Sequence, residues 1–445
     1  DVERSRGLGD VYKRQDHKDG KLLWDVNRLF GEIVAGMKKC KELGKIPVSM
    51  AIDTWAVDYV LLDEKDQILG DTYGYRDHRT DGMDAEVAKI LPETELYGKT
   101  GIQKQIFNTV YQLMAVKQQT PEFLQQAKTL LMLPDYFGFR LTGNKLSEYT
   151  NGSTTQLVNP DTFQWDKELI RKLGYPEDIF LPLQMPGTKV GQLLPEIQKE
   201  VGFDLEVVLC GSHDTASAVM AVPQTEGDGI YISSGTWSLM GIESLKPVIT
   251  EDAAAANFTN EGGYNHRFRF LKNIMGLWMI QSVRHEYNDA YSFAQLCDMA
   301  EESKEFPSRV DVNDQSFLSP DSMVEAIRQY CHKTGQPVPE SVGELTSVVY
   351  RSLAQSYGET VRGLEKIAGK TYDSIHIIGG GSNAAYLNQL TADATGKTVY
   401  AGPGEATAIG NLLAQMIHAG DLADLKSARK CVRESFEIKT FAPAK

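Results

Sequence analysis

The sequence predicts an α/β protein built from two large domains. A chain of 445 residues is longer than a single hydrophobic core usually supports. Short apolar strands alternate with amphipathic helices between residues 21 and 209, and the same alternation begins again at Gly229. A proline and polar residues interrupt the pattern at 222–224. We therefore expect a domain boundary near residue 222 and a ligand-binding cleft between the two domains.

The composition is that of an ordinary globular protein, with 42% hydrophobic and 24% charged residues. The net charge of −14, without a basic stripe, argues against nucleic acid or an anionic membrane as the main partner. The five cysteines are scattered and form no CxxC pair, so we expect free thiols in a reducing compartment. The sequence has neither an apolar run of about 18 residues nor a signal peptide, which predicts a cytoplasmic protein. Both a monomer and a dimer agree with these observations.

Residues 1–15 fit nothing that follows them. They are rich in charge, follow neither the helix period nor the strand period, and do not begin with Met. We expect a non-native leader, such as a translated junction sequence, and a disordered native arm is the alternative. The two domains would then span residues 16–222 and 223–436.

In the first domain, regular structure is expected to begin with a strand at 21–24. A helix with one apolar face follows, and Asp25 is its predicted N-cap. Two further strands are expected at 48–52 and 58–62. Alternating helices and strands then lead to an apolar strand at 206–209.

The second domain is expected to open with a hairpin at 229–243. A mixed, helix-rich region follows at about 270–370. A buried strand at 374–378 then leads through a glycine-rich turn into a helix at 384–392.

Asp214 is the strongest candidate for a catalytic residue. The strand at 206–209 leads through Gly211 to this acid, and a helix of small residues is expected to begin near Thr215. Backbone N–H groups at the start of a helix favour a charged carboxylate. Such a carboxylate can orient a hydroxyl group and accept its proton during transfer to an electrophile. The competing interpretation is an ordinary helix N-cap, a position that Asp often takes.

The turn at 233–237 is a candidate phosphate site because it lies at the tip of the expected hairpin. Successive backbone N–H groups at such a turn form a nest for phosphate oxygens, and the Thr236 hydroxyl adds a donor. Gly235 permits a close approach of the backbone. An ordinary hairpin turn also uses Ser and Gly, so that interpretation stays open.

The turn at 379–383 is a second candidate phosphate site, between an expected strand and an expected helix. Gly379, Gly381 and Ala384 also satisfy the dinucleotide fingerprint G-x-G-x-x-A, with Glu405 as the ribose-binding acid, which keeps a dehydrogenase as an alternative. None of the three Gly-Lys-Thr triplets follows the P-loop spacing.

The segments 53–58 and 75–79 are suited to binding a sugar. They bring together aromatic residues, acids and arginine. An aromatic ring can pack against the C–H face of a sugar while polar groups bond its hydroxyls. The competing interpretation is a buried tryptophan with surface ion pairs.

Together these motifs resemble those of the FGGY carbohydrate kinases, and within that family the branch that phosphorylates L-rhamnulose. The matching stretches cover most of residues 21–415, and such an ordered set is far more specific than one glycine-rich turn. They are IDTWAVD at 52–58, YRDHRT at 75–80, LPDYF at 133–137, EYTN at 148–151, SHDTASAV at 212–219, SSGTWSLMG at 233–241, NEGG at 260–263, LKNIMGLW at 271–278 and IIGGG at 377–381.

The resemblance implies two actin-like ATPase (ribonuclease H-like) domains, an N-terminal one that binds sugar and a C-terminal one that binds nucleotide. It implies closure on the sugar and on ATP with Mg²⁺, and transfer of the γ-phosphoryl group to the 1-hydroxyl of L-rhamnulose. It assigns no metal ligand. The matching site positions are Asp214 as catalytic base, His213, Asp214, Thr215 and Asn273 for the sugar, and Thr236, Gln281 and Gly381 for ATP.

The chain departs from the family pattern at two places. Ala56 stands where the family often has a glycine that touches the sugar through its backbone, so alanine keeps this contact and adds a methyl group to the pocket wall. The family also opens with a strand hairpin that carries Asp-x-Gly and a nearby Arg, which cradles the phosphates and helps to place magnesium. Nothing in residues 1–20 supplies this hairpin, so we expect an N-terminally truncated chain with impaired catalysis.

Two other functions stay open on the sequence. Another kinase of the family, acting on L-fuculose, xylulose or glycerol, is the nearest alternative. A non-catalytic actin-like sugar sensor is an alternative from a different class, since one fold can host several functions. The presence of Asp214 argues against the sensor.

Overall fold

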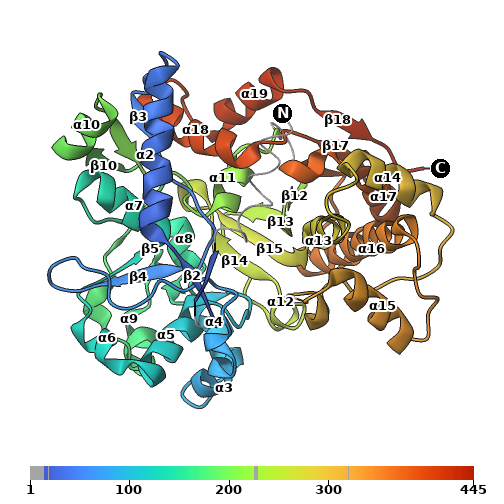
Figure 1. Cartoon of the computed structure of the whole chain (residues 1–445), viewed down its shortest axis with the longest axis horizontal. Coiled ribbons are helices and arrows are strands. Elements are labelled where there is room, and N and C mark those ends of the chain that lie inside the picture. Colours follow the sequence, from blue (N-terminus) through green and yellow to red (C-terminus); the bar gives the residue numbers. More distant parts are fainter. Residues whose placement is uncertain (1–14, 19, 225–228, 319, 445) are drawn as a thin grey trace.

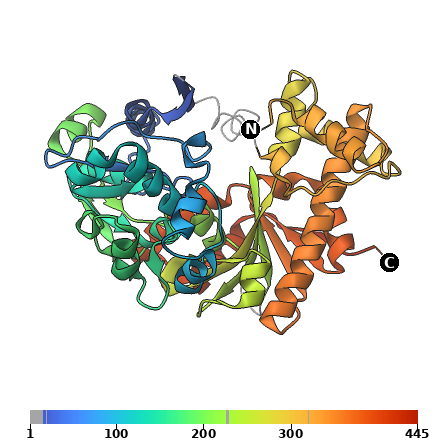
Figure 2. The same ribbon diagram turned by 90° about the horizontal axis from the view of Figure 1, so that it is seen from below.

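The computed structural model describes residues 15–18, 20–224, 229–318 and 320–444. The chain forms two α/β halves, the first coloured blue to green and the second yellow to red (Figures 1 and 2). Each half has its own buried apolar core. Residues 1–14, which make up most of the expected leader, lie outside the described residues.

The first half opens with an antiparallel ribbon of β1 (Gln15–Lys18) and β2 (Lys21–Trp24). The expectation that regular structure begins at residue 21 was wrong, because 15–18 pair along β2, and pairing leaves no periodic signal in so short a segment. Helix α2 (Val26–Glu42) follows as predicted. The Asp25 side chain accepts hydrogen bonds from the N–H groups of Asn27 and Arg28, which confirms the N-cap.

The remaining strands of the first half form small sheets. A three-stranded sheet has the order β10 (Lys189–Gln192), β11 (Glu206–Val208), β3 (Ser49–Met50), and β4 (Tyr59–Leu62) pairs with β5 (Thr129–Met132). Shorter pairs join β6 (Ser147–Glu148) to β9 (Leu183–Gln184) and β7 (Val158–Asn159) to β8 (Gln164–Trp165). The helices are α3 (Met83–Ala88), α4 (Glu93–Thr100), α5 (Thr109–Gln119), α6 (Pro121–Gln126), α7 (Leu133–Thr142), α8 (Tyr149–Ser153), α9 (Lys167–Leu173), α10 (Pro195–Val201) and α11 (Asp214–Met220).

Strand β3 is shorter than the strand expected at 48–52, and this shortening helps to form the site. Beyond Met50 the chain leaves the sheet and pairs with the segment before α11. The Thr54 N–H donates to Ser212 O at 2.9 Å, and the Asp214 N–H donates to Thr54 O at 2.9 Å. The segments 53–58 and 212–215, far apart in sequence, therefore run side by side.

The second half is built on one seven-stranded sheet with the order β14-β15-β13-β12-β16-β17-β18. The hairpin β12 to β13 is antiparallel as predicted, while β16 pairs parallel to β12. The strands are β12 (Ile230–Ser234), β13 (Trp237–Ser244), β14 (Thr259–Gly262), β15 (Phe268–Met275), β16 (Ser374–Ile378), β17 (Thr398–Ala401) and β18 (Lys439–Phe441).

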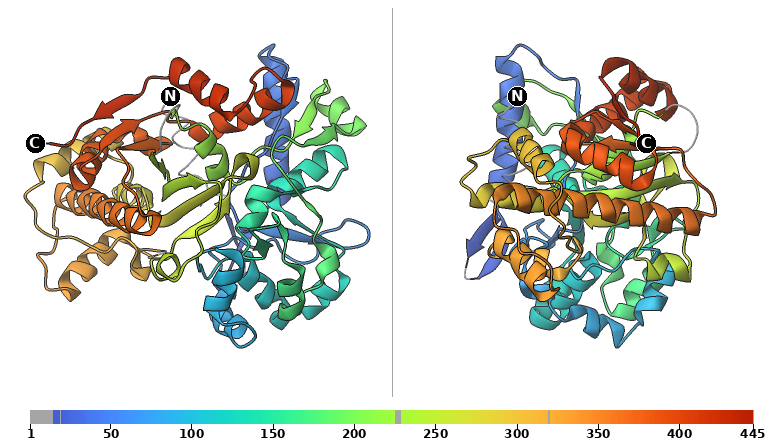
Figure 3. Two further views of the ribbon diagram at one scale, coloured as in Figure 1. Left: turned by 180° about the vertical axis from the view of Figure 1, so that it is seen from behind. Right: turned by 90° about the vertical axis from the view of Figure 1, so that its right-hand side faces the viewer.

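Helices cover both faces of this sheet. Ile230 and Ile232 point into a core shared with α16 (Val342–Ala368), which Figure 3 shows as the long orange helix. Tyr231, between them, points to the opposite core with α11, α18 (Ala406–Ala419) and α19 (Leu425–Ser435). The other helices are α12 (Glu251–Ala255), α13 (Trp278–Glu286), α14 (Phe293–Glu302), α15 (Met323–Lys333) and α17 (Ala385–Thr395).

Helix α18 joins the two halves, and Figure 1 shows it beside β3 of the first half. Ser49 Oγ donates to Gln415 Oε1 at 2.8 Å, and Asn411 Nδ2 donates to Asp53 Oδ2 at 2.5 Å. Helix α11 packs on α18 and on the sheet of the second half, so it belongs to that core although it precedes residue 222. No helix in the described part of the chain is long and apolar enough to cross a membrane.

Candidate active site

A cavity of about 1150 Å³ lies between the two halves. Its walls come from the segments 55–57 and 102–108, the start of α11, the β12–β13 hairpin, and the turns at 379–386 and 404–407. Ligand pockets usually measure about 300–1,000 Å³, so this cavity is larger than most pockets for a single ligand.

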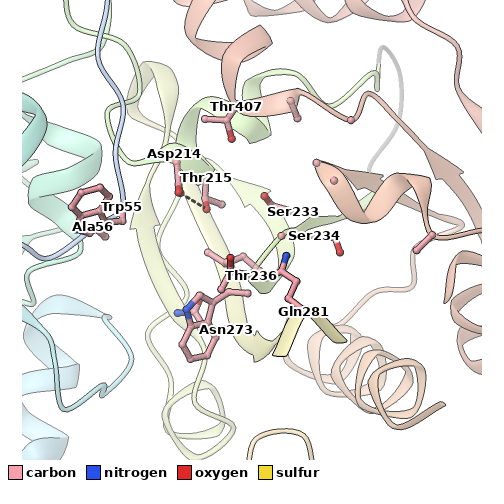
Figure 4. A pocket seen from close by; sticks show the side chains of 18 of the residues that line it. Trp55, Ala56, Asp214, Thr215, Ser233, Ser234, Thr236, Asn273, Gln281 and Thr407 are labelled. Atoms are coloured by element: carbon pink, nitrogen blue, oxygen red, sulfur yellow. Dashed lines mark hydrogen bonds between the residues drawn. The ribbon is translucent and has the colours of Figure 1, made fainter. Parts of the chain in front are cut away.

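Asp214 projects into the middle of this cavity (Figure 4). Its side chain is 46% exposed, and its Oδ1 accepts a hydrogen bond from Thr215 Oγ1 at 3.0 Å. His213, and not Asp214, occupies the N-cap position of α11, and its side chain makes no capping bond. The competing interpretation of Asp214 as an N-cap is therefore wrong. Residues 212–214 pair with Thr54, and α11 begins at Asp214, one residue earlier than expected.

A buried carboxyl group, Glu148, supports the turn that carries Asp214. Its Oε2 accepts from Ser212 Oγ at 2.6 Å, Ser212 N at 3.2 Å and Asn151 N at 2.9 Å. Asn151 Nδ2 in turn donates to the carbonyl oxygens of Trp55 and Ser212, both at 3.3 Å. Burial raises the pKa of Glu148 above its ordinary value. These bonds hold the segments 55–56 and 212–214 against each other.

His213 is nearly buried, with 8% of its side chain exposed, and three charged groups surround its ring. Its Nε2 lies 3.4 Å from Asp214 Oδ1. Its Nδ1 lies 3.0 Å from Arg269 Nη2 and 3.3 Å from Glu261 Oε2. Arg269 and Glu261 are on β15 and β14 of the second half, so the ring of His213 bridges the two halves.

One side of the cavity has an aromatic wall from the first half. Trp55 and Ala56 lie across the cavity from Ser233, Ser234 and Gln281 (Figure 4), and Tyr75 and Phe107 extend the wall with ring centroids 5.2 Å apart. Asn273, on β15, reaches the same region and donates from Nδ2 to Gln103 Oε1 at 3.0 Å. All of these groups are able to contact a polyol.

The segments 53–58 and 75–79 divide into residues that line the cavity and residues that support it. Asp58 is buried, and its Oδ2 accepts from Trp24 Nε1 at 2.7 Å, Trp55 Nε1 at 2.8 Å and Tyr75 N at 3.1 Å. Burial raises the pKa of Asp58 to about 6, against the N–H donors that lower it. We expected the acids of these segments to contact a sugar directly. For Asp58 this was wrong, because its carboxylate is buried and instead fixes the ring of Trp55.

Asp53 is the acid of the same segment that lies near the base candidate. Its pKa is raised to about 7, first by burial and further by the negative charge of Asp214, against the hydrogen bond from Asn411. Two carboxyl groups so close together resist simultaneous ionisation.

The opposite side of the cavity comes from the second half. Ser233, Ser234, Thr236 and Gln281 face Asp214 from there (Figure 4). The predicted nest of free N–H groups at the hairpin tip is only partly present, because the Gly235 N–H donates to Trp237 O at 2.8 Å.

The turn at 379–383 lines the cavity through Gly379, Gly380 and Asn383, while Gly381 is buried behind them. A Cβ atom at Gly381 would lie 2.0 Å from Ser234 Oγ. Gly381 therefore lets this turn pack against the β12 strand, and any contact of Gly381 with a ligand would come from its backbone.

The sequence did not reveal several residues of the cavity. Thr407, at the start of α18, approaches Asp214 from above (Figure 4). The small residues that follow β17 were its only local signal. An end of the cavity away from Asp214 is lined by Phe293, Cys297, Tyr350 and Tyr386.

In the described part of the chain, no cluster of three or more His, Cys, Asp or Glu side chains could hold a metal ion.

Comparison with known families identifies the fold. The family model for the N-terminal domain of the FGGY family of carbohydrate kinases matches residues 11–221, and the model for its C-terminal domain matches residues 230–419. The chain belongs to the FGGY family of carbohydrate kinases. It is a sugar kinase that transfers a phosphoryl group to an alcohol, and the predicted two-domain α/β fold is confirmed.

Relatives with known names match almost the whole chain. A rhamnulokinase of Halalkalibacterium halodurans is 53% identical over 96% of this chain and 91% of its own length. Rhamnulokinases of Oceanobacillus iheyensis and Bacillus subtilis are 50% and 46% identical, over 94% and 96% of this chain and 89% and 87% of their own lengths.

Solved structures of lower identity share the fold. A ligand-bound xylulose kinase from Lactobacillus acidophilus has a TM-score of 0.79 at 17% identity, covering 97% of this chain and 88% of that one. Plasmodium falciparum glycerol kinase with ADP has a TM-score of 0.74 at 14% identity, again over 97% and 88%. At such identities the likeness concerns the fold alone.

Proposed function

We propose that this kinase transfers the γ-phosphoryl group of ATP to the 1-hydroxyl of L-rhamnulose. The observation that carries the proposal is the carboxylate of Asp214, half-exposed between the aromatic wall of the first half and the hairpin of the second (Figure 4). The names of the relatives, which are rhamnulokinases at 40–53% identity, support the choice of sugar.

In this proposal Asp214 is the general base. The oxygen of the sugar hydroxyl forms a bond to the γ-phosphorus, the bond from that phosphorus to the bridging oxygen of ADP breaks, and the hydroxyl proton passes to the carboxylate. Thr215 Oγ1 and His213 Nε2 both approach Oδ1. We therefore assign Oδ2 to the proton transfer, since Oδ1 is already oriented by its neighbours.

We propose that the first half holds the sugar, with Asn273 of β15 reaching across from the second half. His213, Thr215 and Asn273 supply polar groups, the backbone of Ala56 supplies a further contact, and the ring of Trp55 packs against the C–H face. Asp58 supports this arrangement, because it fixes the Trp55 ring by a hydrogen bond of 2.8 Å.

We propose that the second half holds the nucleotide. Thr236, Gln281 and the backbone around Gly381 would contact the phosphates, near the point where the Asp214 carboxylate opens. The aromatic end of the cavity at Phe293, Tyr350 and Tyr386 offers apolar surface suited to a base.

The charge of the cavity supports magnesium as the cofactor. Among the described lining residues there is no Lys or Arg, whereas five are acidic: Glu261, which is paired with the buried Arg269, and Asp214, Asp298, Glu301 and Glu405. A polyphosphate alone would be repelled by such a wall. Mg²⁺ is commonly held by one or two carboxylates together with substrate phosphates, so an acidic wall agrees with Mg²⁺ that enters with ATP. When bound, it neutralises the charge that develops on the transferred group.

The proposal is tested by measuring ADP release with each of four substrates: L-rhamnulose, L-fuculose, D-xylulose and glycerol. We expect the highest kcat/KM with L-rhamnulose. A preference for another sugar would contradict the assignment of the substrate. The impairment expected from residues 1–20 stays a prediction, so the panel is run on this chain and on one with a grafted Asp-x-Gly hairpin. Sugar binding without turnover in both would favour a sugar sensor.

A further inference from the structure

Arg269 is a fully buried guanidinium beside the cavity. It lies on β15 with 0% of its side chain exposed. Its Nε donates to Gly262 O at 2.9 Å, and its Nη2 lies 3.1 Å from Glu261 Oε2 and 3.0 Å from His213 Nδ1. A buried charge is costly unless it is paired, so three directed contacts on one residue call for an explanation beyond packing.

The contact between Arg269 and His213 has a chemical consequence. A guanidinium is always protonated and only donates hydrogen bonds. The ring nitrogen that faces it must therefore offer a lone pair, which leaves the proton of a neutral ring on the other nitrogen. Here the facing nitrogen is Nδ1, so the proton belongs on Nε2, the atom 3.4 Å from Asp214 Oδ1.

We propose that Arg269 is a positioning residue that holds His213 as the neutral tautomer with its proton on Nε2, so that this N–H points to Asp214 and to the sugar. Only the contact between the His213 N–H and the sugar rests on the proposed function. An N–H at this place faces the Asp214 carboxylate as a donor. The opposite tautomer would set a lone pair of the ring against a carboxylate oxygen.

Glu261 completes the arrangement as the counter-ion of Arg269. Burial alone would raise the pKa of Glu261, but the charge of Arg269 holds that pKa below its ordinary value. An ionised Glu261 compensates the guanidinium, and the pair leaves no net charge beside a neutral His213. Glu261 also favours the opposite tautomer, because its Oε2, 3.3 Å from Nδ1, could accept a hydrogen bond from an Nδ1–H group.

The arrangement links the two halves of the molecule. Arg269 and Glu261 are held by strand pairing, since Arg269 and Glu261 are register partners of β15 and β14. His213 is held by the pairing of Thr54 with the segment before α11. The orientation of the His213 ring is therefore set by Arg269 and Glu261, which the sheet of the second half holds rigidly.

Long-range ¹H–¹⁵N correlation spectra of the ¹⁵N-histidine-labelled chain at pH 8, without ligands, test the proposal directly. The His213 signal is assigned by its loss in His213→Gln. We expect an unprotonated Nδ1 and a protonated Nε2. A protonated Nδ1, in either a neutral or a charged ring, would overturn the proposal. This readout does not depend on turnover, so it stands whether or not L-rhamnulose is the substrate.

Variants separate positioning from packing. Arg269→Met combined with Glu261→Leu removes both charges together, which avoids leaving one buried charge alone. We expect a mixture of tautomers at His213 and an unchanged KM for ATP. The kcat/KM for sugar should fall at least about 10-fold, the scale known for lost outer partners of metal-bound histidines. Arg328→Lys is the control, because Arg328 also makes several directed hydrogen bonds but lies away from the cavity. An unaltered tautomer in the folded double variant would mean that Arg269 has only a structural role.

Discussion

Replacing Asp58 by alanine should destabilise the first half and weaken sugar binding through the same side chain. The Asp58 carboxylate is 1% exposed and accepts four hydrogen bonds, from Trp24 Nε1, Trp55 Nε1, Tyr75 N and Gln112 Nε2. Gln112 Nε2 also donates to Phe107 O at 2.9 Å, so it keeps a partner in the variant. Three donors would lose their acceptor.

The magnitude follows from these three donors. A buried donor without a partner costs about 1–3 kcal/mol, which sums to about 3–9 kcal/mol. Water can enter the space of the lost carboxylate and serve some of the donors, so we expect about 3–5 kcal/mol of the free energy of unfolding to be lost. Asp58→Asn keeps one acceptor oxygen for the tryptophans and should lose only about 1–2 kcal/mol.

Chemical denaturation followed by tryptophan fluorescence measures this loss, because two of the affected donors are indoles. Asp63→Ala is the matched control: Asp63 also accepts from two N–H groups, those of Lys65 and Gln67, but it does so in an exposed turn. We expect the order wild type, Asp58→Asn, Asp58→Ala in falling stability, with Asp63→Ala close to wild type. Because Trp55 lines the cavity, the Kd for sugar should rise in the same order. Equal stability of Asp58→Ala and Asp63→Ala would refute the reasoning.

Three further outcomes are expected. Asp214→Asn should lower kcat by at least about 100-fold while the Kd for sugar changes far less, and near-normal turnover would exclude a general base there. Gly381→Ala should raise the KM for ATP, since its Cβ would meet Ser234 Oγ at 2.0 Å, whereas Gly98→Ala, with nothing within 4 Å, should behave as wild type. Asp53 has a folded pKa of about 7 against an ordinary 3.8, so the folded state holds its proton more tightly than the unfolded state does. Wild type should therefore lose stability relative to Asp53→Asn as pH rises from 4 to 7, and a flat difference in unfolding free energy across that range would contradict the raised pKa.

Much of the secondary structure could be predicted because its signals are local. The cap of α2, its apolar face and the β12–β13 hairpin depend on residues a few positions apart. Asp214 stood out for the same reason, as an acid at a junction between strand and helix. The length of β3 and the existence of β1 could not be predicted, because both depend on which distant strand offers a partner.

The sequence by itself determined the family, the two-domain α/β class and the identity of the base candidate, since these rest on ordered motifs and on periodicity within short windows. Only the tertiary structure decided the surroundings of that base. Glu148, Arg269 and Asn411 reach the segments around Asp214 through hydrogen bonds that join residues 56 to 358 positions apart. Such contacts leave no pattern along the chain, because burial makes them necessary and only folding brings their partners together.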